Sequence, residues 1–286
     1  MNILQIIKKH LHSLSNSQKS IAQYILSNYK KAAFLNSIEL AQVTGVSNPT
    51  VIRFATALGY TGYPQFQAAL QNMIQNELSS LERLNYLKPA IDDSNLTGIY
   101  QLEINNIEQI YKNLDADKIM QASNLLYQSD RIFIVGEQIS DSIADFAAYS
   151  LNKICAEVYR LKHWDLNINK MLNENEKTAS SALIIALPRY PNKTLQYIRR
   201  LREQEIPMII ITDSAAFPNI FDADVLLFAP IRYISFIDPI SAIICLINSI
   251  LIEITRLDQS KAEKYLSKFE EYVDRCYIYN KDTIPL

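Results

Sequence analysis

Four short runs of continuous apolar residues constrain the fold of this 286-residue chain more than any other feature. They are RIFIV at 131–135, ALIIAL at 182–187, PMIII at 207–211 and DVLLFA at 224–229. Continuous rather than alternating apolar runs are typical of strands buried on both faces of a parallel sheet. Stretches with helical periodicity lie between or after them, at 140–154, 192–204 and 239–257. This order predicts a doubly wound α/β domain, in which ligands bind outside the carboxyl ends of the strands.

Polar residues follow three of these predicted strands, where such a ligand would bind. After 131–135, Gly136 and Glu137 lead into a helix that begins near Ser140 and Ser142. Hydroxyls and backbone N–H groups at a helix start can bind an anion such as phosphate, although serines there are just as common as simple helix caps. An arginine after the second run supplies a planar guanidinium suited to phosphate or carboxylate. The other candidate effector-binding residues are Arg189, Tyr190 and Thr194 after 182–187, and Asp213 and Ser214 after 207–211.

Residues 1–78 show a different pattern, that of consecutive short helices. Within them, IELAQVTGVSNPTVIRFATAL at 38–58 has the spacing of two helices joined by a tight turn. Ala41 is small where the helices would cross closely, and Gly45, four residues later, can take the positive φ that the turn needs. Ser47 is placed to cap the second helix, and Pro49 is tolerated in its first turn. The segment therefore predicts a helix-turn-helix.

A helical wheel divides the second of these helices into two faces. Val51, Phe54, Ala55 and Leu58 fall on one side, which must face the core. The opposite side carries no acid and one arginine, a residue that can pair with a guanine edge, as asparagine can with adenine. Hydroxyls at the amino-terminal end can contact phosphate. The candidate DNA-binding residues are therefore Ser47, Asn48, Pro49, Thr50, Ile52, Arg53 and Thr56.

The charge of the chain is distributed unevenly. The formal net charge is only −2, but residues 1–80 carry six Lys or Arg against two Asp or Glu, whereas the remainder carries 22 against 28. A basic first quarter on an acidic body indicates an anionic partner at that end. This asymmetry favours a helix placed in the DNA major groove over the alternative, a helical hairpin with a solvated face.

Several classes of protein are excluded or disfavoured. The three cysteines, Cys155, Cys245 and Cys276, form no CxxC pair, which argues against a disulfide framework or a thiolate zinc site and fits a reducing cytoplasm. The five glycines form neither GxGxxG nor GxxxxGK[ST], so no nucleotide cofactor is expected. The uncharged run at 239–252 is too short for a bilayer and predicts a buried core helix. We expect a cytoplasmic protein without metal, cofactor or membrane.

Two stretches of the chain resemble a known family. LSNSQKSIAQYILSN, followed by SIELAQVTGVSNPTVIRFATALGYTGYPQF, closely resembles the amino-terminal domain of the RpiR (MurR/RpiR) family of bacterial transcriptional regulators, over about residues 1–77. IIITDSAAFPNIFDADVLLFAP resembles part of the SIS (sugar isomerase) domain, the usual carboxy-terminal partner, within a match of about 115–255. The resemblance implies a DNA-binding regulator whose α/β domain dimerises and senses a sugar phosphate.

The second half departs from the pattern of that family. Gln138 stands where phosphosugar binders usually have the second glycine of a GxGxS-like loop, and only Thr194 remains of the usual SxSGxT loop. Glu137 beside the first loop would repel a phosphate dianion unless it is paired. An effector site is therefore implied in the usual place, with chemistry that can differ from the family's.

The sequence thus predicts a two-domain α plus α/β protein, with a helix-turn-helix domain at 1–78, a linker at 79–98 and a SIS-like domain at 99–286. The expected function is a transcriptional regulator that binds a double-stranded DNA operator as a homodimer or higher oligomer and senses a phosphorylated sugar or related sugar derivative. One alternative is a sugar-phosphate isomerase with an appended helical domain, although His163 is a lone candidate base and no catalytic residues are expected. The other is a regulator whose SIS-like domain only dimerises.

Overall fold

A computed structural model describes residues 3–74, 77–86, 97–155, 157–163, 168, 178–213, 217, 222–233 and 235–276. The chain divides into two compact units. The first comprises Met1–Leu102 with Arg232–Ile237, and the second comprises Glu103–Ile231 with Asp238–Leu286, so the division falls within one helix, α7 (Thr97–Lys112). Each unit is described by itself.

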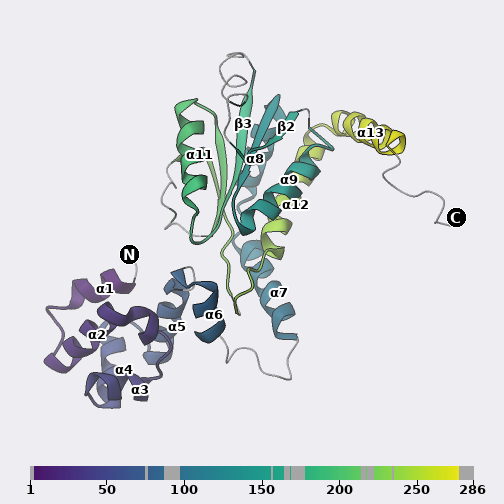
Figure 1. The fold of residues 1–286 in the computed structure, drawn as a ribbon. Coiled ribbons are helices and arrows are strands. Elements are labelled where there is room, and N and C mark those ends of the chain that lie inside the picture. Colours follow the sequence, from purple (N-terminus) through teal and green to yellow (C-terminus); the bar gives the residue numbers. More distant parts are fainter. Residues whose placement is uncertain are drawn as a thin grey trace. The chain divides into compact units, whose positions relative to one another are not determined.

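The first unit is helical (Figure 1). Its helices are α1 (Ile3–His10), α2 (Asn16–Ala32), α3 (Ser37–Thr44), α4 (Asn48–Ala57), α5 (Tyr63–Ile74) and α6 (Ser80–Tyr86). Capping boxes begin α2 and α3: Ser15 pairs with Gln18, and Asn36 pairs with Glu39. Fully buried side chains from α2 to α5 form one hydrophobic core, which includes Ile21, Leu40, Val51, Phe54 and Phe66. The helical half of the predicted fold class is confirmed.

Part of the predicted linker is helical. Helix α6 lies within 79–98, and Ser79 and Glu82 form a reciprocal cap at its start: the Ser79 N–H donates to Glu82 Oε2 (2.8 Å) and the Glu82 N–H to Ser79 Oγ (3.2 Å). This Ser-x-x-Glu box is the sequence signal that the linker interpretation passed over. The rest of the predicted linker, 87–96, lies outside the described residues.

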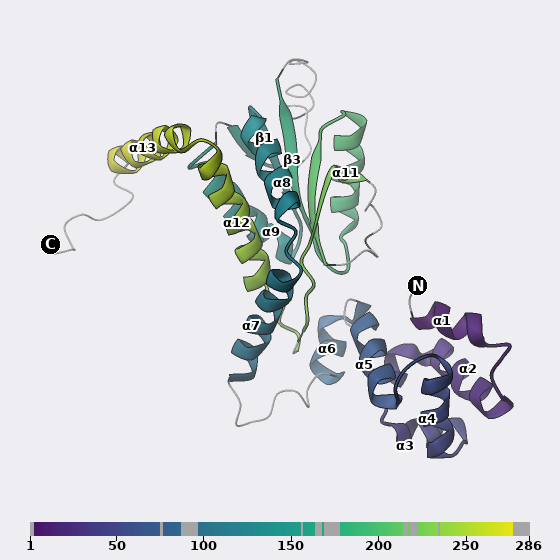
Figure 2. The same cartoon turned by 180° about the vertical axis from the view of Figure 1, so that it is seen from behind.

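The second unit is a parallel five-stranded sheet with the strand order β2-β1-β3-β4-β5. Its strands are β1 (Arg131–Gly136), β2 (Glu157–Arg160), β3 (Ser180–Ala186), β4 (Met208–Thr212) and β5 (Val225–Phe228). Its helices after α7 are α8 (Ala116–Gln128), α9 (Ile139–Leu151), α11 (Asn192–Glu203), α12 (Ser241–Leu257) and α13 (Gln259–Arg275). Helices α8, α9 and α12 cover one face and α11 the other (Figure 2). The doubly wound α/β prediction is confirmed.

Helices α7 and α8 are separate, because the chain turns at 113–115 and Asp115 caps α8 by accepting from the Lys118 N–H (3.2 Å). The apolar run 239–252 lies mostly in α12, which buries Ile243, Leu246 and Ile250 in the domain core as predicted. Within the described ranges, no helix is both long and apolar enough to cross a bilayer.

Candidate functional site

The turn between α3 and α4 has the geometry that its glycine permits. Gly45 ends α3 in the left-handed region (φ +69°), and its N–H donates to Gln42 O (3.3 Å). Ser47 precedes α4 in extended conformation, but its hydroxyl makes no cap to the helix. It pairs instead with Thr50 Oγ1 (2.8 Å), to which Arg53 Nη2 donates (3.2 Å). The predicted cap by Ser47 is wrong, and a chain of side-chain hydrogen bonds runs along the first turns of α4.

The two faces of α4 are largely those of the helical wheel. Val51, Phe54, Ala55 and Leu58 are buried. The side chains of Pro49, Ile52, Arg53 and Thr56 are exposed. Asn48 differs, because it is half-buried and its Oδ1 is enclosed, without a hydrogen-bond partner among the described residues. The outward face is therefore centred on Arg53 rather than shared equally with Asn48.

The aromatic residues after α4 pack in or against the core and do not form an exposed stacking surface. Phe66 meets the ring of Phe54 edge-on, with centroids 5.6 Å apart, and that of Tyr60 at 5.5 Å. Tyr63 donates from its hydroxyl to Leu35 O (2.6 Å), and burial raises the pKa of its phenol. The contact of Phe66 with Phe54 packs the buried face of α4 against the core and so fixes the orientation of its outward face.

In the second unit, the strand order places the predicted loops at one edge. Strands β2 and β3 pair with opposite sides of β1, so the strand order changes direction between β1 and β3. The loops after β1 and β3 therefore lie at a topological switch point, and the end of β4 lies beside β3. Ser140 is buried and Ser142 exposed on α9. A Cβ on Gly136 would lie 2.2 Å from Ser140 O, so this glycine allows β1 to pack closely against α9.

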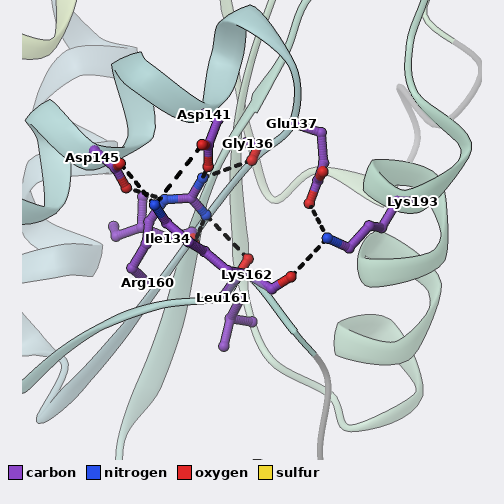
Figure 3. Close-up of polar contacts among 9 residues, drawn as sticks. All are labelled: Ile134, Gly136, Glu137, Asp141, Asp145, Arg160, Leu161, Lys162 and Lys193. Carbon is purple, nitrogen blue, oxygen red and sulfur yellow. Dashed lines mark hydrogen bonds and ion pairs between the residues drawn. The ribbon is translucent and has the colours of Figure 1, made fainter.

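A half-buried arginine that sequence reasoning missed makes most of the polar contacts at this edge (Figure 3). Arg160, the last residue of β2, donates to three carbonyls: Nη2 to Gly136 O (2.7 Å), and Nη1 to Ile134 O and Leu161 O (both 3.1 Å). It also pairs with Asp141 and, through Nε, with Asp145 Oδ1 (3.0 Å). The two aspartates lie one turn apart on the same face of α9. In the sequence, this pair of acids followed by an arginine at the end of the next strand is the feature that could have predicted the cluster.

Glu137 is paired rather than free. Its Oε1 lies 2.8 Å from the Lys193 ammonium, which also donates to Lys162 O (2.7 Å), so the pair joins the loop after β1 to the start of α11 (Figure 3). The hydrogen bond that Lys193 donates to the Glu137 carboxylate raises the pKa of Lys193. Lys162 in turn donates to Asp145 Oδ2 (2.9 Å). Lys193, Lys162 and Glu137 thus form an ordered charge network at this edge of the sheet.

The predicted residues after β3 and β4 are brought together only in part. The Tyr190 hydroxyl donates to Asp213 Oδ1 (2.5 Å), which joins the two loops. Arg189 is exposed and, like Tyr190, has a positive φ, +70° against +24°. Thr194 is 1% exposed, and its Oγ1 is enclosed without a hydrogen-bond partner within the described part of the chain. Ser214 lies outside the described residues.

A pocket of about 340 Å³ lies beside Asp213 in the second unit. Its walls are mostly apolar, and the Lys118 ammonium lies 5.9 Å from the ring centroid of Phe228 within them. The volume is in the range of small-molecule sites. Of the predicted site residues, only Asp213 lines this pocket. The remaining lining residues, which include Ile110, Lys118, Phe228 and Leu246, come from segments without a polar motif.

Comparison with known proteins defines the class of the chain. Residues 1–77 match the model of the helix-turn-helix domain of the rpiR family. YfhH of Escherichia coli K12, named as an uncharacterized HTH-type transcriptional regulator, is 31% identical over 159 residues, which are 54% of this chain and 56% of YfhH. The match to HexR of Pseudomonas aeruginosa covers 50% of this chain and 50% of HexR. The chain therefore spans about half the length of these two curated relatives.

Two solved structures share the fold. NanR of Vibrio vulnificus, complexed with ManNAc-6P, has a TM-score of 0.56 at 18% identity and covers 96% of this chain and 99% of its own. The sugar isomerase domain of an RpiR transcription factor from Sphaerobacter thermophilus has a TM-score of 0.56 at 21% identity, covering 61% of this chain and 97% of that domain. The chain therefore joins a helix-turn-helix unit to a SIS-type α/β unit. Its first unit is a helix-turn-helix domain of the RpiR family.

The names of the relatives agree with a regulator rather than an isomerase. YfhH, the two HexR proteins and GlvR of Bacillus subtilis are all named as HTH-type transcriptional regulators. In the second unit, the side chain of His163 is exposed.

Proposed function

We propose that this chain is a cytoplasmic DNA-binding transcriptional regulator whose α/β unit senses a small sugar derivative. The observation that carries the proposal is the outward face of α4, which is exposed, free of acids and centred on Arg53. Support comes from the match of residues 1–77 to a helix-turn-helix domain and from the names of the relatives. The proposed domain division is 1–78, 79–98 and 99–286.

The proposed DNA contacts follow from the position of each residue on α4. Arg53 would read base edges, Ser47 and Thr50 would contact phosphate, and an apolar side chain would meet a thymine methyl group; Asn48, whose Oδ1 is enclosed, would lie at the margin of this face. The residues assigned to the face are Ser47, Asn48, Pro49, Thr50, Ile52, Arg53 and Thr56. A homodimer would set two such helices about one DNA turn apart on a near-palindromic operator.

Replacing Arg53 with alanine tests the DNA-binding proposal. The operator is first selected from random DNA with the purified full chain. Arg53→Ala is expected to weaken specific binding by about 1–3 kcal/mol, roughly fivefold to more than a hundredfold, because a bidentate contact to a base is lost. Quantitative footprinting measures the loss.

Two matched variants make the Arg53 result specific. Arg53→Lys keeps the positive charge but loses the planar guanidinium that can make two hydrogen bonds to one base. The variant should therefore retain non-specific DNA binding and show a weaker preference at one base pair. Arg199→Ala removes an exposed arginine from α11 in the other unit and should leave the footprint unchanged. An unaltered footprint with folded Arg53→Ala would refute the groove assignment.

The effector site is proposed at the carboxyl edge of the sheet, with Gly136, Glu137, Ser140, Ser142, Arg189, Tyr190, Thr194, Asp213 and Ser214 as its residues. Effector binding would favour one arrangement of the α/β units in the dimer and so change operator affinity; a coupling of about 1–3 kcal/mol suffices for control. A thermal-shift screen of sugars, sugar acids and sugar phosphates identifies the effector, because a ligand of the folded state raises apparent stability with occupancy.

Replacing Arg189 with alanine tests that site. Arg189 is exposed beside the Tyr190–Asp213 hydrogen bond, and alanine leaves an L-residue at the same positive φ, so the loop is not relaxed. The variant should bind the operator as wild type without effector, and should bind the effector about tenfold more weakly because a charge-assisted hydrogen bond is lost. A full effector response in the variant, measured by fluorescence anisotropy on labelled operator, would place the site elsewhere.

A further inference from the structure

The charged groups at the edge formed by β1, β2 and α11 already neutralise one another. Arg160 is bonded to Asp141 and Asp145 and to three backbone carbonyls. Lys162 pairs with Asp145 (2.9 Å), and Lys193 with Glu137 (2.8 Å). Each of these three cations therefore has a carboxylate of this chain as its partner. An anionic ligand would have to compete with that carboxylate for the cation.

Two backbone N–H groups at the start of α9 already have hydrogen-bond partners. The N–H groups of Ser140 and Asp141, which an anion at a helix start would use, donate to the carbonyls of Glu137 (3.1 Å) and Gln138 (3.0 Å). Asp141 places a carboxylate in the first turn, where it takes up the favourable interaction with the helix dipole. A phosphate at this position would lie close to two carboxylates, those of Glu137 and Asp141.

The Glu137 carboxylate binds the Lys193 ammonium, to which an anionic ligand would otherwise bind. Its side chain is 18% exposed and that of Lys193 is 43% exposed, so both can be reached from solvent. A phosphate dianion would have to displace Glu137 from Lys193 and would then lie beside an unpaired carboxylate. A hydroxyl group can donate to Glu137 and accept from Lys193 while the ion pair stays intact.

We propose that Glu137 is a specificity-determining residue, which makes the loop after β1 select an uncharged, hydroxyl-rich end of the effector and reject a phosphate. The inference rests on the proposed effector site, and narrows its ligand to sugar derivatives that present no phosphate to this loop. It does not depend on the DNA contacts of α4.

Inorganic phosphate is the probe that tests the proposal. It is titrated into the full chain by calorimetry at neutral pH and constant ionic strength. Glu137→Gln frees Lys193 and removes a negative charge, so phosphate should bind at least about tenfold more tightly than to wild type. Adding Lys193→Gln to that variant should abolish the gain, because the freed cation is the one that binds.

Control variants keep the result interpretable. Glu157→Gln removes the same charge from the start of β2, where Glu157 pairs with Arg131, and should leave phosphate affinity at the wild-type value. Glu137→Ala also frees Lys193 and should show the same gain in phosphate affinity, which decides the matter if Glu137→Gln fails to fold. Equal phosphate affinity in wild type and Glu137→Gln, or a gain that survives Lys193→Gln, overturns the proposal.

The outcomes also separate this inference from the proposed function. The phosphate titration needs no operator, so a chain that binds no DNA can still show the predicted gain, and then only the regulator proposal fails. A normal operator response to a sugar derivative, combined with no change of phosphate affinity in Glu137→Gln, removes the role of Glu137 alone.

Discussion

Replacing Phe54 with alanine is expected to lower the free energy of unfolding of the helical unit by about 3–5 kcal/mol. The Phe54 ring is fully buried in α4, and its edge contact with Phe66 joins α4 to α5. Alanine would leave a cavity at the centre of the core, lined by side chains that cannot collapse to fill it. Because small domains are stable by about 5–15 kcal/mol, this loss would bring the unit close to unfolding.

Hydrogen exchange measures that loss where it occurs. Two linked units need not unfold as one, so amide protection of peptides from α2 to α5 is a better measure than a global melting curve. Ile52→Ala on the same helix is the matched control: its side chain is 44% exposed, and the change should stay within about 0.5 kcal/mol. Protection in Phe54→Ala equal to that in Ile52→Ala would mean that α4 does not pack as described.

Replacing Arg160 with methionine should destabilise the α/β unit by about 2–4 kcal/mol. Methionine fills much of the same space but leaves three carbonyls without their donor and two carboxylates without their cation. The estimate lies below the cost of breaking a fully buried pair, because Asp141 and Asp145 are nearly half exposed and water can replace part of the interaction. Amide exchange of β1, β2 and α9 measures the effect.

The pH dependence of this deficit has a defined sign. The hydrogen bond from Lys162, followed by the charge of Arg160, holds the pKa of Asp145 below its usual value. A group with a lowered folded pKa stabilises the fold above its unfolded pKa, and that contribution is lost as pH falls through the folded pKa. The Arg160→Met deficit should therefore shrink in acid. Arg256→Met, which breaks an exposed pair with Glu253 on α12, should cost at most about 1 kcal/mol at any pH.

The helix-turn-helix could be predicted from the sequence because its determinants are local. Gly45 adopts the left-handed conformation its position required, and the wheel correctly separated the buried side chains Val51, Phe54 and Ala55 from the exposed Arg53. Asn48 was placed too far outward because side chains on a helix tilt toward its amino-terminal end. The first residue of α4 therefore lies against the preceding turn rather than on the open face.

The effector edge could be predicted only in outline. Continuous apolar runs located the strands, and the loops after β1, β3 and β4 do meet at one edge. The sequence did not reveal that Glu137 pairs with Lys193, or that Thr194 is enclosed. The pocket beside Asp213 was missed because its apolar walls come from α7, α8, β5 and α12, which have no shared motif.

The sequence by itself determined most of the helices, the four strands with continuous apolar runs and the order of the two units, because backbone preferences and apolar periodicity act over a few neighbouring residues. Only the tertiary structure decided which charges neutralise one another. Arg160 meets Asp141 and Asp145, and Lys193 meets Glu137, across segments that are far apart along the chain. Such pairings depend on strand order, and strand order is set by how the whole sheet packs against its helices rather than by any local stretch.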